Sequence, residues 1–385
     1  QSFASDDPVI RAIWDEGVEH SQVYELSQVI MDSIGPRLTG SPGMARANDW
    51  SVAKYVEWGI EAYKEQYGTW RGWERGISHV DLISPRVRSL EGMAAAWSPA
   101  TEGPVEAGVV ILADAGNSAA FEAWLPEVRG KFVLISPPQT TCRPDEGWER
   151  FADSSVYRKM RETRDRRARD WEVRIERTGS TVRTLPGVLE RGGVAGVLTS
   201  TWSGGWGVTR IFGARTEEVP SLDLSCEDFG LLFRLAENAQ GPVLSVEAHG
   251  ERLGEVPVYN TIAEGRGVSL PDEYVVLSSH LDSWDGGSGA TDTGAGTIAI
   301  RSRSIPCATF RILPCCTPFS VRSVVGTPAQ MQALGHNGAS EAEGYLVLEA
   351  ALQGTRRQVT FTGLYERAVR VEADETNANR KARDD

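Results

Sequence analysis

Residues 275–296, which read VVLSSHLDSWDGGSGATDTGAG, restrict the possible folds of this chain more than any other stretch. The stretch opens with β-branched and aliphatic residues, a composition and length typical of a short buried strand. His280 and Asp282 follow at the end of this strand, before a glycine-rich loop that is unsuited to regular structure. The chain then reaches Asp292 and a Gly-Ala-Gly segment that leads into a predicted helix. Because ligands of open α/β sheets bind just beyond the strand ends, this order predicts an α/β sheet with a polar site at that edge.

His280, Asp282 and Asp292 are the residue types that a metal site needs. Residues two apart on an extended segment point the same way, so the side chains of His280 and Asp282 can serve one site. A neutral imidazole is a good zinc ligand, and a neighbouring carboxylate can orient a ligand or a base. The glycine-rich loop allows Asp292 to fold back, and its two oxygens can bridge metal ions about 3.5–4 Å apart. The combination of features disfavours the alternative, an ordinary strand-end histidine beside a plain loop.

The segment S-S-H-L-D-S-W-D-G-G-S-G-A-T-D-T-G-A-G resembles the first two metal motifs of the two-zinc aminopeptidase and glutamate carboxypeptidase family. The resemblance implies that His280 binds one zinc ion and that Asp292 bridges both ions of the pair. It also implies that Asp282 is the supporting catalytic aspartate beside the ligands. The expected fold is therefore α/β, a mixed-sheet zinc-exopeptidase domain with helices on both faces. The expected cofactor is zinc, with two ions in intact relatives.

The chain of 385 residues is long enough for two domains or more. Residues 1–100 are predicted to form the N-terminal part of the peptidase domain, and residues 256–300 the part that carries the metal motifs. Residues 101–255, between these parts, contain buried-type strand segments such as K-F-V-L-I and V-A-G-V-L. The order of these segments resembles the protease-associated domain that is inserted in this family. We therefore expect a protease-associated-like insert at 101–255.

Two further patterns allow alternative interpretations. A helix is predicted over residues 44–63, with a buried stripe made of Trp50, Ala53, Val56 and Ile60. After it comes an aromatic stretch with Tyr67, Trp70 and Trp73, side chains that either pack in the core or line a peptide site. The segment 149–177 is dense in both acids and arginines, a pattern that favours a solvated helix over a nucleic-acid surface.

Composition excludes some partners and compartments. The chain has 53 Asp and Glu against 40 Lys and Arg, a net charge of −13 that argues against general binding to nucleic acids or anionic membranes. No run of 18 apolar residues is present, so no membrane span is expected. The family it resembles is usually exported, and a start at Gln1 without Met fits a processed chain. We therefore expect a secreted or periplasmic protein, in which Cys142 and Cys226 could form a disulfide that the sequence alone does not establish.

The chain changes character after residue 300. The predicted helix meets R-S-R-S and then Pro306, and no Asp or Glu occurs from 293 to 340. Each zinc ion needs about four ligands, and hydrolysis needs a carboxylate base. The resemblance implies a later Glu-Glu pair and a final histidine, but the nearest candidates, Glu341, Glu343 and His336, have neither that spacing nor that order. Our hypothesis is that residues 301–385 are a divergent or frame-shifted tail, and reading the coding DNA in its other two frames tests it.

Two functions of different classes follow from these observations. The first is a zinc-dependent exopeptidase, of the aminopeptidase or dipeptidase type, whose activity is impaired in this chain. Its expected partner is a peptide or dipeptide substrate, and a homodimer is left open. The second is a catalytically inactive scaffold or binding protein that keeps the peptidase fold. Metal content separates the two, because the enzyme retains zinc and loses peptidase activity on chelation.

Overall fold

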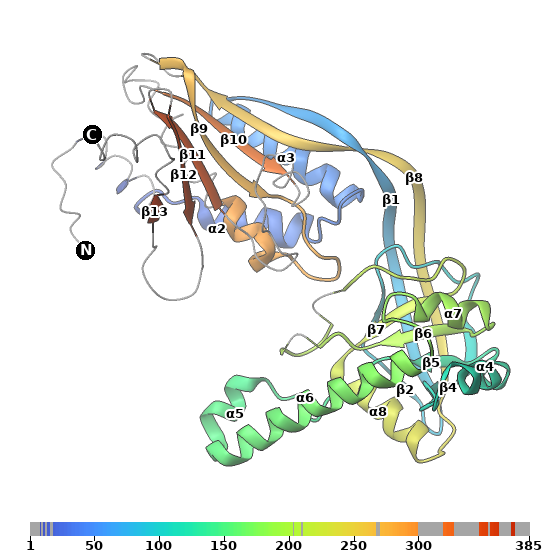
Figure 1. The fold of residues 1–385 in the computed structure, drawn as a ribbon. Helices are drawn as coiled ribbons and strands as arrows, with labels where there is room; N and C mark the ends of the chain where they lie inside the picture. The colour runs from blue at the N-terminus through green and yellow to red at the C-terminus, as the bar shows by residue number, and fades with distance from the viewer. Residues whose placement is uncertain are drawn as a thin grey trace, which may run out of the picture. The chain divides into compact units, whose positions relative to one another are not determined.

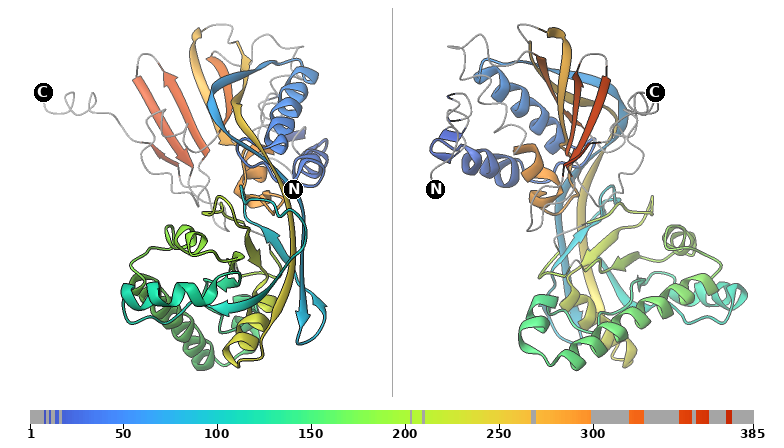
Figure 2. Two further views of the ribbon diagram at one scale, coloured as in Figure 1. Left: turned by 90° about the vertical axis from the view of Figure 1, so that its right-hand side faces the viewer. Right: turned by 60° about the vertical axis from the view of Figure 1, so that its left-hand side comes forward.

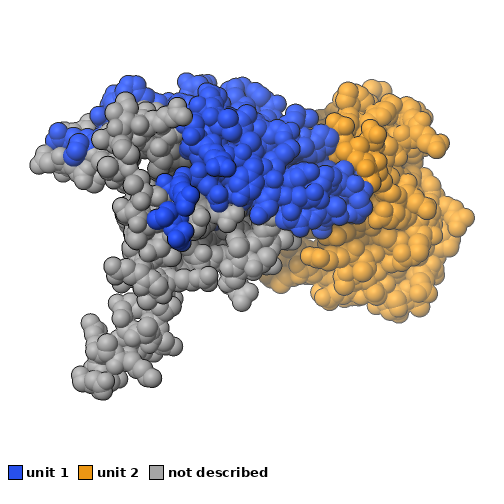
Figure 3. Space-filling model, turned by 90° about the horizontal axis from the view of Figure 1, so that it is seen from above, with its two compact units in different colours: residues 1–72, 255–284, 288–385 blue, residues 73–254, 285–287 orange. Residues whose placement is uncertain are grey.

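The computed structural model describes residues 8, 11, 14–15, 18–202, 204–208, 211–266 and 270–298, together with four later strands. The chain forms two units, drawn in different colours in Figure 3. Unit 1 comprises Gln1–Gly72, Glu255–Trp284 and Ser288–Asp385, and unit 2 comprises Trp73–Gly254 and Asp285–Gly287. Two long strands, β1 (Glu61–Ser84) and β8 (Val243–Gly265), contribute residues to both units.

The described strands of unit 1 form a mixed sheet in the order β13-β12-β11-β9-β10-β8, with β1 beside β8 (Figure 1). The strands that follow β8 are β9 (Leu270–His280), β10 (Phe319–Gly326), β11 (Leu346–Leu352), β12 (Thr355–Phe361) and β13 (Val371–Ala373). The central strand β9 is parallel to β10 and antiparallel to β11. The prediction of an α/β fold with a mixed sheet is therefore confirmed, and His280 ends an interior strand, as the motif predicted.

Three helical segments precede this sheet in unit 1, namely α2 (Val23–Gln28), the π-helix η1 (Val29–Ile34) and α3 (Pro42–Glu57). Figure 2 shows α2 and α3 beside the strands of the unit. Residues that flank the metal motifs pack against these helices in one apolar cluster, made of Leu26, Ile30, Met44, Ala47, Leu281 and Ile298. Because Leu281 is fully buried there, the backbone between His280 and Asp282 is fixed by packing.

The prediction for α3 was right in type but wrong in its end and its buried face. The helix starts where Ser41 accepts a hydrogen bond from the Met44 amide, and it ends before Gly59, whose φ is +78°. Val56, predicted to be buried, is 57 % exposed. The face that is buried instead carries small and polar residues, including Asn48 and Ser51, whose side chains bond back to carbonyls one turn earlier. An apolar periodicity alone could not find that face.

The sheet of unit 2 runs in the order β8-β4-β5-β6-β7-β3. Its strands are β3 (Gly92–Ala94), β4 (Val105–Ile111), β5 (Phe132–Leu134), β6 (Gly196–Thr199) and β7 (Ser221–Leu224), while the short β2 (Arg88–Ser89) lies off this order and pairs with β1. Neighbours from β4 to β7 are parallel, and β8 and β3 pair antiparallel at the two ends. The described helices of the unit are α4 (Ser118–Trp124), η2 (Leu125–Val128), α5 (Asp145–Phe151), α6 (Ser154–Arg177), α7 (Leu185–Arg191) and α8 (Cys226–Glu237).

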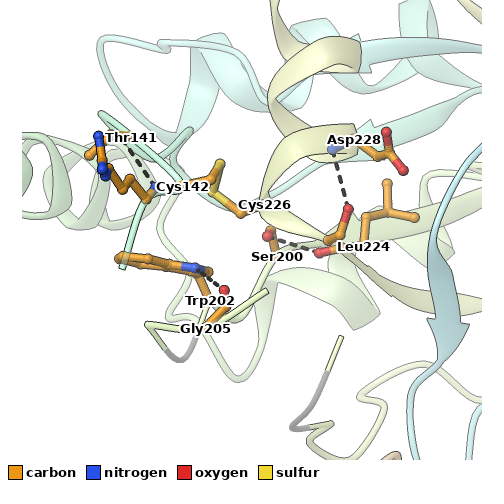
Figure 4. Close-up of a disulfide and its surroundings, with 10 residues drawn as sticks. Thr141, Cys142, Ser200, Trp202, Gly205, Leu224, Cys226 and Asp228 are labelled. Atoms are coloured by element: carbon orange, nitrogen blue, oxygen red, sulfur yellow. Dashed lines mark hydrogen bonds between the residues drawn. A yellow bond between two sulfur atoms is a disulfide. The ribbon is translucent and has the colours of Figure 1, made fainter. Parts of the chain in front are cut away.

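Structural details bear on three of the sequence alternatives. The mixed-charge segment forms α6, which buries only Met160, Trp171 and Ile175, as expected of a solvated helix. Trp73 is 1 % exposed and packs against Gly250, so this residue of the aromatic stretch packs in the core, whereas Tyr67 and Trp70 are exposed and the alternative stays open for them. Cys142 and Cys226 form a disulfide with a Cα–Cα distance of 5.6 Å, which ties a loop to the start of α8 (Figure 4). Among the described helices, none has both the length and the apolar character needed to cross a bilayer.

Candidate metal centre

The three side chains singled out from the sequence meet at the carboxyl end of β9. The Nδ1 atom of His280 lies 3.1 Å from Oδ1 of Asp282, and its Nε2 atom lies 3.2 Å from Oδ1 of Asp292. The imidazole therefore stands between two carboxylates, one contributed by the strand end and one by the turn beyond the glycine-rich loop. The structure brings His280, Asp282 and Asp292 together as the spacing predicted, while their roles remain predictions.

The charges around His280 favour the protonated ring in the absence of metal. Burial alone would lower the pKa of this histidine, but hydrogen bonds to Asp282 and Asp292 outweigh the burial and raise the pKa to about 9. A metal ion that binds Nε2 must displace this proton, so binding and proton release are coupled. The ring nitrogen that faces Asp282 keeps its hydrogen bond when the other nitrogen binds metal, which fixes the ring orientation.

Glycine is required where the loop turns back toward the strand. Gly289 has φ +63° and ψ +35°, a left-handed conformation that L side chains rarely adopt, and it starts the π-helical turn η3 (Ala290–Gly294). A Cβ at this position would lie 2.6 Å from Nη2 of Arg37 and 2.8 Å from Oγ of Ser283. The Gly294 amide donates to the Gly289 carbonyl at 2.8 Å, which closes the turn that presents Asp292.

Arg37 and Thr39, two residues that the sequence analysis did not select, contact this loop directly. Arg37 is fully buried, and its guanidinium donates to the carbonyls of Leu281, Ser288 and Gly289. Burial lowers its pKa to about 10, although the charges of Asp282 and Asp292 act in the opposite direction. The Thr39 hydroxyl donates to Oδ2 of Asp282 at 3.2 Å. Both residues lie in the turn-rich P-R-L-T-G-S-P-G segment, where neither an apolar periodicity nor a charge pattern selects them.

The described residues fit a zinc ion in part. His280 Nε2 and Asp292 Oδ1 lie close together and are two donor atoms of the types that zinc prefers. Asp282 contacts the other ring nitrogen, Nδ1, and so orients the imidazole. No group of three or more His, Cys, Asp or Glu side chains that could hold a metal ion is found in the described part of the chain. The candidates Glu341, Glu343 and His336 lie outside the described residues.

The pairing of β9 with β10 locates the position that a carboxylate from the next strand would occupy. The two strands are parallel, and Gly326, the last residue of β10, pairs with His280. A carboxylate contributed by the end of β10 would therefore have to lie at Gly326 or just beyond it. The residues there read G-T-P-A-Q, without an acid. The strand that should complete the site is thus present in the sheet but carries no carboxylate at its end.

Residues 260–302 match the family model for peptidase family M28. Across a longer stretch the chain is 25 % identical to carboxypeptidase Q of Mus musculus over 283 residues, and 24 % identical to that of Homo sapiens over 285 residues. The matched stretches cover 73 % of this chain, but 54 % of the mouse protein and 53 % of the human protein. A crystal structure of a peptidase M28 precursor from Shewanella amazonensis aligns with a TM-score of 0.54 and 24 % identity, covering 82 % of this chain and 66 % of that one.

These matches agree with the resemblance recognised from the motif: the chain is similar to peptidase family M28 over residues 260–302, and to carboxypeptidase Q over a longer stretch. The chain spans about half the length of the curated relatives that it matches. The solved structure supports the fold alone, so the activity of this chain is inferred from its site.

Proposed function

We propose that this chain is a zinc-dependent exopeptidase of the aminopeptidase or dipeptidase type whose catalytic activity is impaired. The observation that carries the proposal is the arrangement of His280 between Asp282 and Asp292, with contacts of 3.1 and 3.2 Å. The family match over residues 260–302 includes all three residues. The expected substrates are dipeptides or the terminal bonds of short peptides.

Each of the three residues has a separate role in this proposal. His280 and Asp292 would hold zinc, and Asp292 has the second oxygen needed to reach another ion. Asp282 would accept a hydrogen bond from Nδ1 of the ring, which leaves Nε2 as the ligand atom. When bound, zinc supplies a Lewis acid and lowers the pKa of water, which is the chemistry that peptide hydrolysis needs.

The sequence after β9 is the reason to expect impairment. A hydrolase of this type needs a carboxylate base and further ligands, and the end of β10 beside His280 provides neither. The stretch without Asp or Glu from 293 to 340 extends well past that strand end. The same observation favours the second candidate function, an inactive scaffold that keeps the fold and at most one weak metal site.

Metal analysis of the purified protein, combined with a dipeptide hydrolysis assay, tests the proposal. We expect zinc to be retained and lost on chelation, with hydrolysis that is slow and depends on the metal. His280→Gln is the matched control, because it removes a ligand and keeps a polar side chain of similar size. Retained zinc without any hydrolysis supports the scaffold, and so does a protein that retains no zinc. Near two zinc ions per chain with rapid hydrolysis would show that the tail completes the site after all.

The remaining parts of the proposal concern the insert and the compartment. We propose that residues 101–255 form a protease-associated-like domain, supported by the parallel strands β4 to β7 in that range. We also propose a secreted or periplasmic location, supported by the Cys142–Cys226 disulfide, because such bonds persist in oxidising compartments. Peptide mapping of protein purified from its native source, without reduction, tests whether this bond is present.

A further inference from the structure

Arg37 is a fully buried arginine whose hydrogen bonds within the described residues go to backbone carbonyls. The guanidinium donates to five of them: Leu281 at 2.8 Å, Ile30 at 3.1 Å, Gly35 at 2.7 Å, Ser288 at 3.0 Å and Gly289 at 3.0 Å. A buried cation that is not bonded directly to an anion is costly, so its presence calls for a compensating role. Nε and Nη2 make one bond each, and the two N–H groups of Nη1 are shared among three carbonyls. A planar guanidinium spreads its donors over three nitrogens in this way, whereas a lysine ammonium has its three donors on one nitrogen.

The positions of these carbonyls connect Arg37 to both halves of the metal centre. Leu281 lies between His280 and Asp282, so the bond from Nε holds the strand end. Ser288 and Gly289 directly precede the turn that carries Asp292, so the bonds from Nη1 and Nη2 hold the start of that turn. One side chain therefore bridges the two segments whose separation sets the distance from His280 to Asp292.

The backbone beside Arg37 reinforces this bridge. The Arg37 amide donates to Oγ of Ser283 at 2.9 Å, and the Ser283 amide donates to the Arg37 carbonyl at 3.1 Å. Two residues further on, the Thr39 hydroxyl donates to Asp282. The charges of Asp282 and Asp292 also favour the charged guanidinium. The segment from Arg37 to Thr39 thus contacts the strand end, the loop and one of the carboxylates.

We propose that Arg37 is the positioning residue of the metal centre, and that it holds the strand end and the Asp292 turn at the separation that one metal ion requires. This inference rests on the proposed function, because it assigns Arg37 a role toward the zinc site. It makes two claims beyond fold stability: Arg37 sets the zinc affinity of the folded protein, and it sets the environment of the His280 ring.

Zinc affinity is measured by competition with a chromophoric chelator in wild-type protein, Arg37→Lys, Arg37→Met and the control Arg46→Met. Arg46 is exposed on α3 in the same unit, so its loss leaves the centre untouched. Loss of groups that orient ligands typically weakens metal binding about 10–100-fold. We expect a loss of that size in both Arg37 variants, including the lysine that keeps the charge, and no change in Arg46→Met. Folded Arg37 variants that bind zinc as wild type does would overturn the proposal.

A second readout does not depend on zinc. In protein labelled with ¹⁵N-histidine, the His280 ring signals are assigned with His280→Gln. We expect these signals to shift in Arg37→Lys and to stay unchanged in Arg46→Met. Identical His280 signals in Arg37→Lys and wild type would overturn the inference. If wild-type protein binds no zinc, the proposed function fails, while the His280 signals still decide the role of Arg37.

A third measurement covers the case in which both Arg37 variants fail to fold. In wild-type protein the Nε–H signal of Arg37 is assigned through its own side-chain spin system. We expect this proton to exchange slowly with solvent and its signal to shift when zinc is added. An Arg37 signal that exchanges as fast as that of Arg46, or that zinc binding leaves unchanged, would contradict a positioning role.

Discussion

Replacement of Gly289 by alanine tests whether close packing against Arg37 and Ser283 fixes the metal loop. Alanine in the left-handed conformation costs about 1–2 kcal/mol, which Gly289 at φ +63° avoids. The added Cβ would also lie 2.6 Å from Nη2 of Arg37 and in closer overlap with Cβ of Ser283. Overpacking of this kind costs about 1–3 kcal/mol more. The expected loss in the free energy of unfolding is therefore about 2–5 kcal/mol. Zinc binding should also weaken, because the Arg37 side chain that bridges the two segments must shift.

Gly59→Ala is the matched control for this variant. Gly59 has φ +78° in the same unit, and nothing lies within 4 Å of the position of its Cβ. Alanine there should carry only the backbone cost of about 1–2 kcal/mol and leave zinc binding unchanged. The assay is urea unfolding together with hydrogen exchange of the backbone amides of 281–294, which locates the loss. If Gly289→Ala is no more destabilising than Gly59→Ala and binds zinc equally well, the packing argument is wrong.

Three further outcomes follow from the described contacts. Asp282→Asn should weaken zinc binding about 10–100-fold, since the amide no longer fixes the imidazole as a carboxylate does, and chelator competition measures this loss. In metal-free protein the pKa of His280 is raised to about 9, above its unfolded value of about 6.5. The protonated ring therefore contributes its full stabilisation below about pH 6.5, and this contribution is lost as the pH rises through 9. A ¹⁵N-histidine titration should give a midpoint near pH 9 in wild-type protein and a lower midpoint in Asp282→Asn. The double variant Cys142→Ser, Cys226→Ser removes a disulfide that closes a loop with a sequence separation of 84. Loop entropy limits the resulting loss in the free energy of unfolding to about 4.6 kcal/mol, and urea unfolding compared with the oxidised wild type measures this loss.

The motif residues could be predicted because their geometry is local. A strand end, two residues at alternate positions and a glycine-rich return loop place His280, Asp282 and Asp292 together without knowledge of the rest of the fold. Some strands before residue 300 were also predicted from short β-branched and aliphatic runs, such as those that form β5 and β9, whereas β10 to β13 were not predicted. Boundaries and buried faces were less accurate, as α3 shows, since tertiary contacts decide which face of a weakly apolar helix is covered.

Arg37 could not have been assigned from the sequence by the same reasoning. Its partners at the metal centre are backbone carbonyls 244 to 252 residues away along the chain, its other two are local carbonyls, and a carbonyl carries no residue-specific signal. Neither periodicity nor charge pairing indicates such a contact, because no acidic side chain at a regular spacing serves as its partner. Asp285, the last acid of the D-S-W-D segment, is the opposite case, because its position in the sequence suggests a ligand that the structure does not support. Its buried side chain forms an ion pair with Arg75 in unit 2. An acidic residue next to a metal motif is therefore not evidence of a ligand.

Metal binding and hydrolysis depend on different parts of this chain. The groups that hold the centre in place, from Arg37 and Thr39 to Gly289, all precede residue 300, and they contact one another within the described residues. The groups that hydrolysis still needs would come from the end of β10 or later, where the sequence lacks acids until Glu341. A chain can therefore lose the base and keep a partial zinc site, because the partners of Arg37 within the described residues all precede residue 300. It follows that zinc retention tests the scaffold built by residues 30–39 and 281–292, whereas peptidase activity tests residues 301–385, and neither result substitutes for the other.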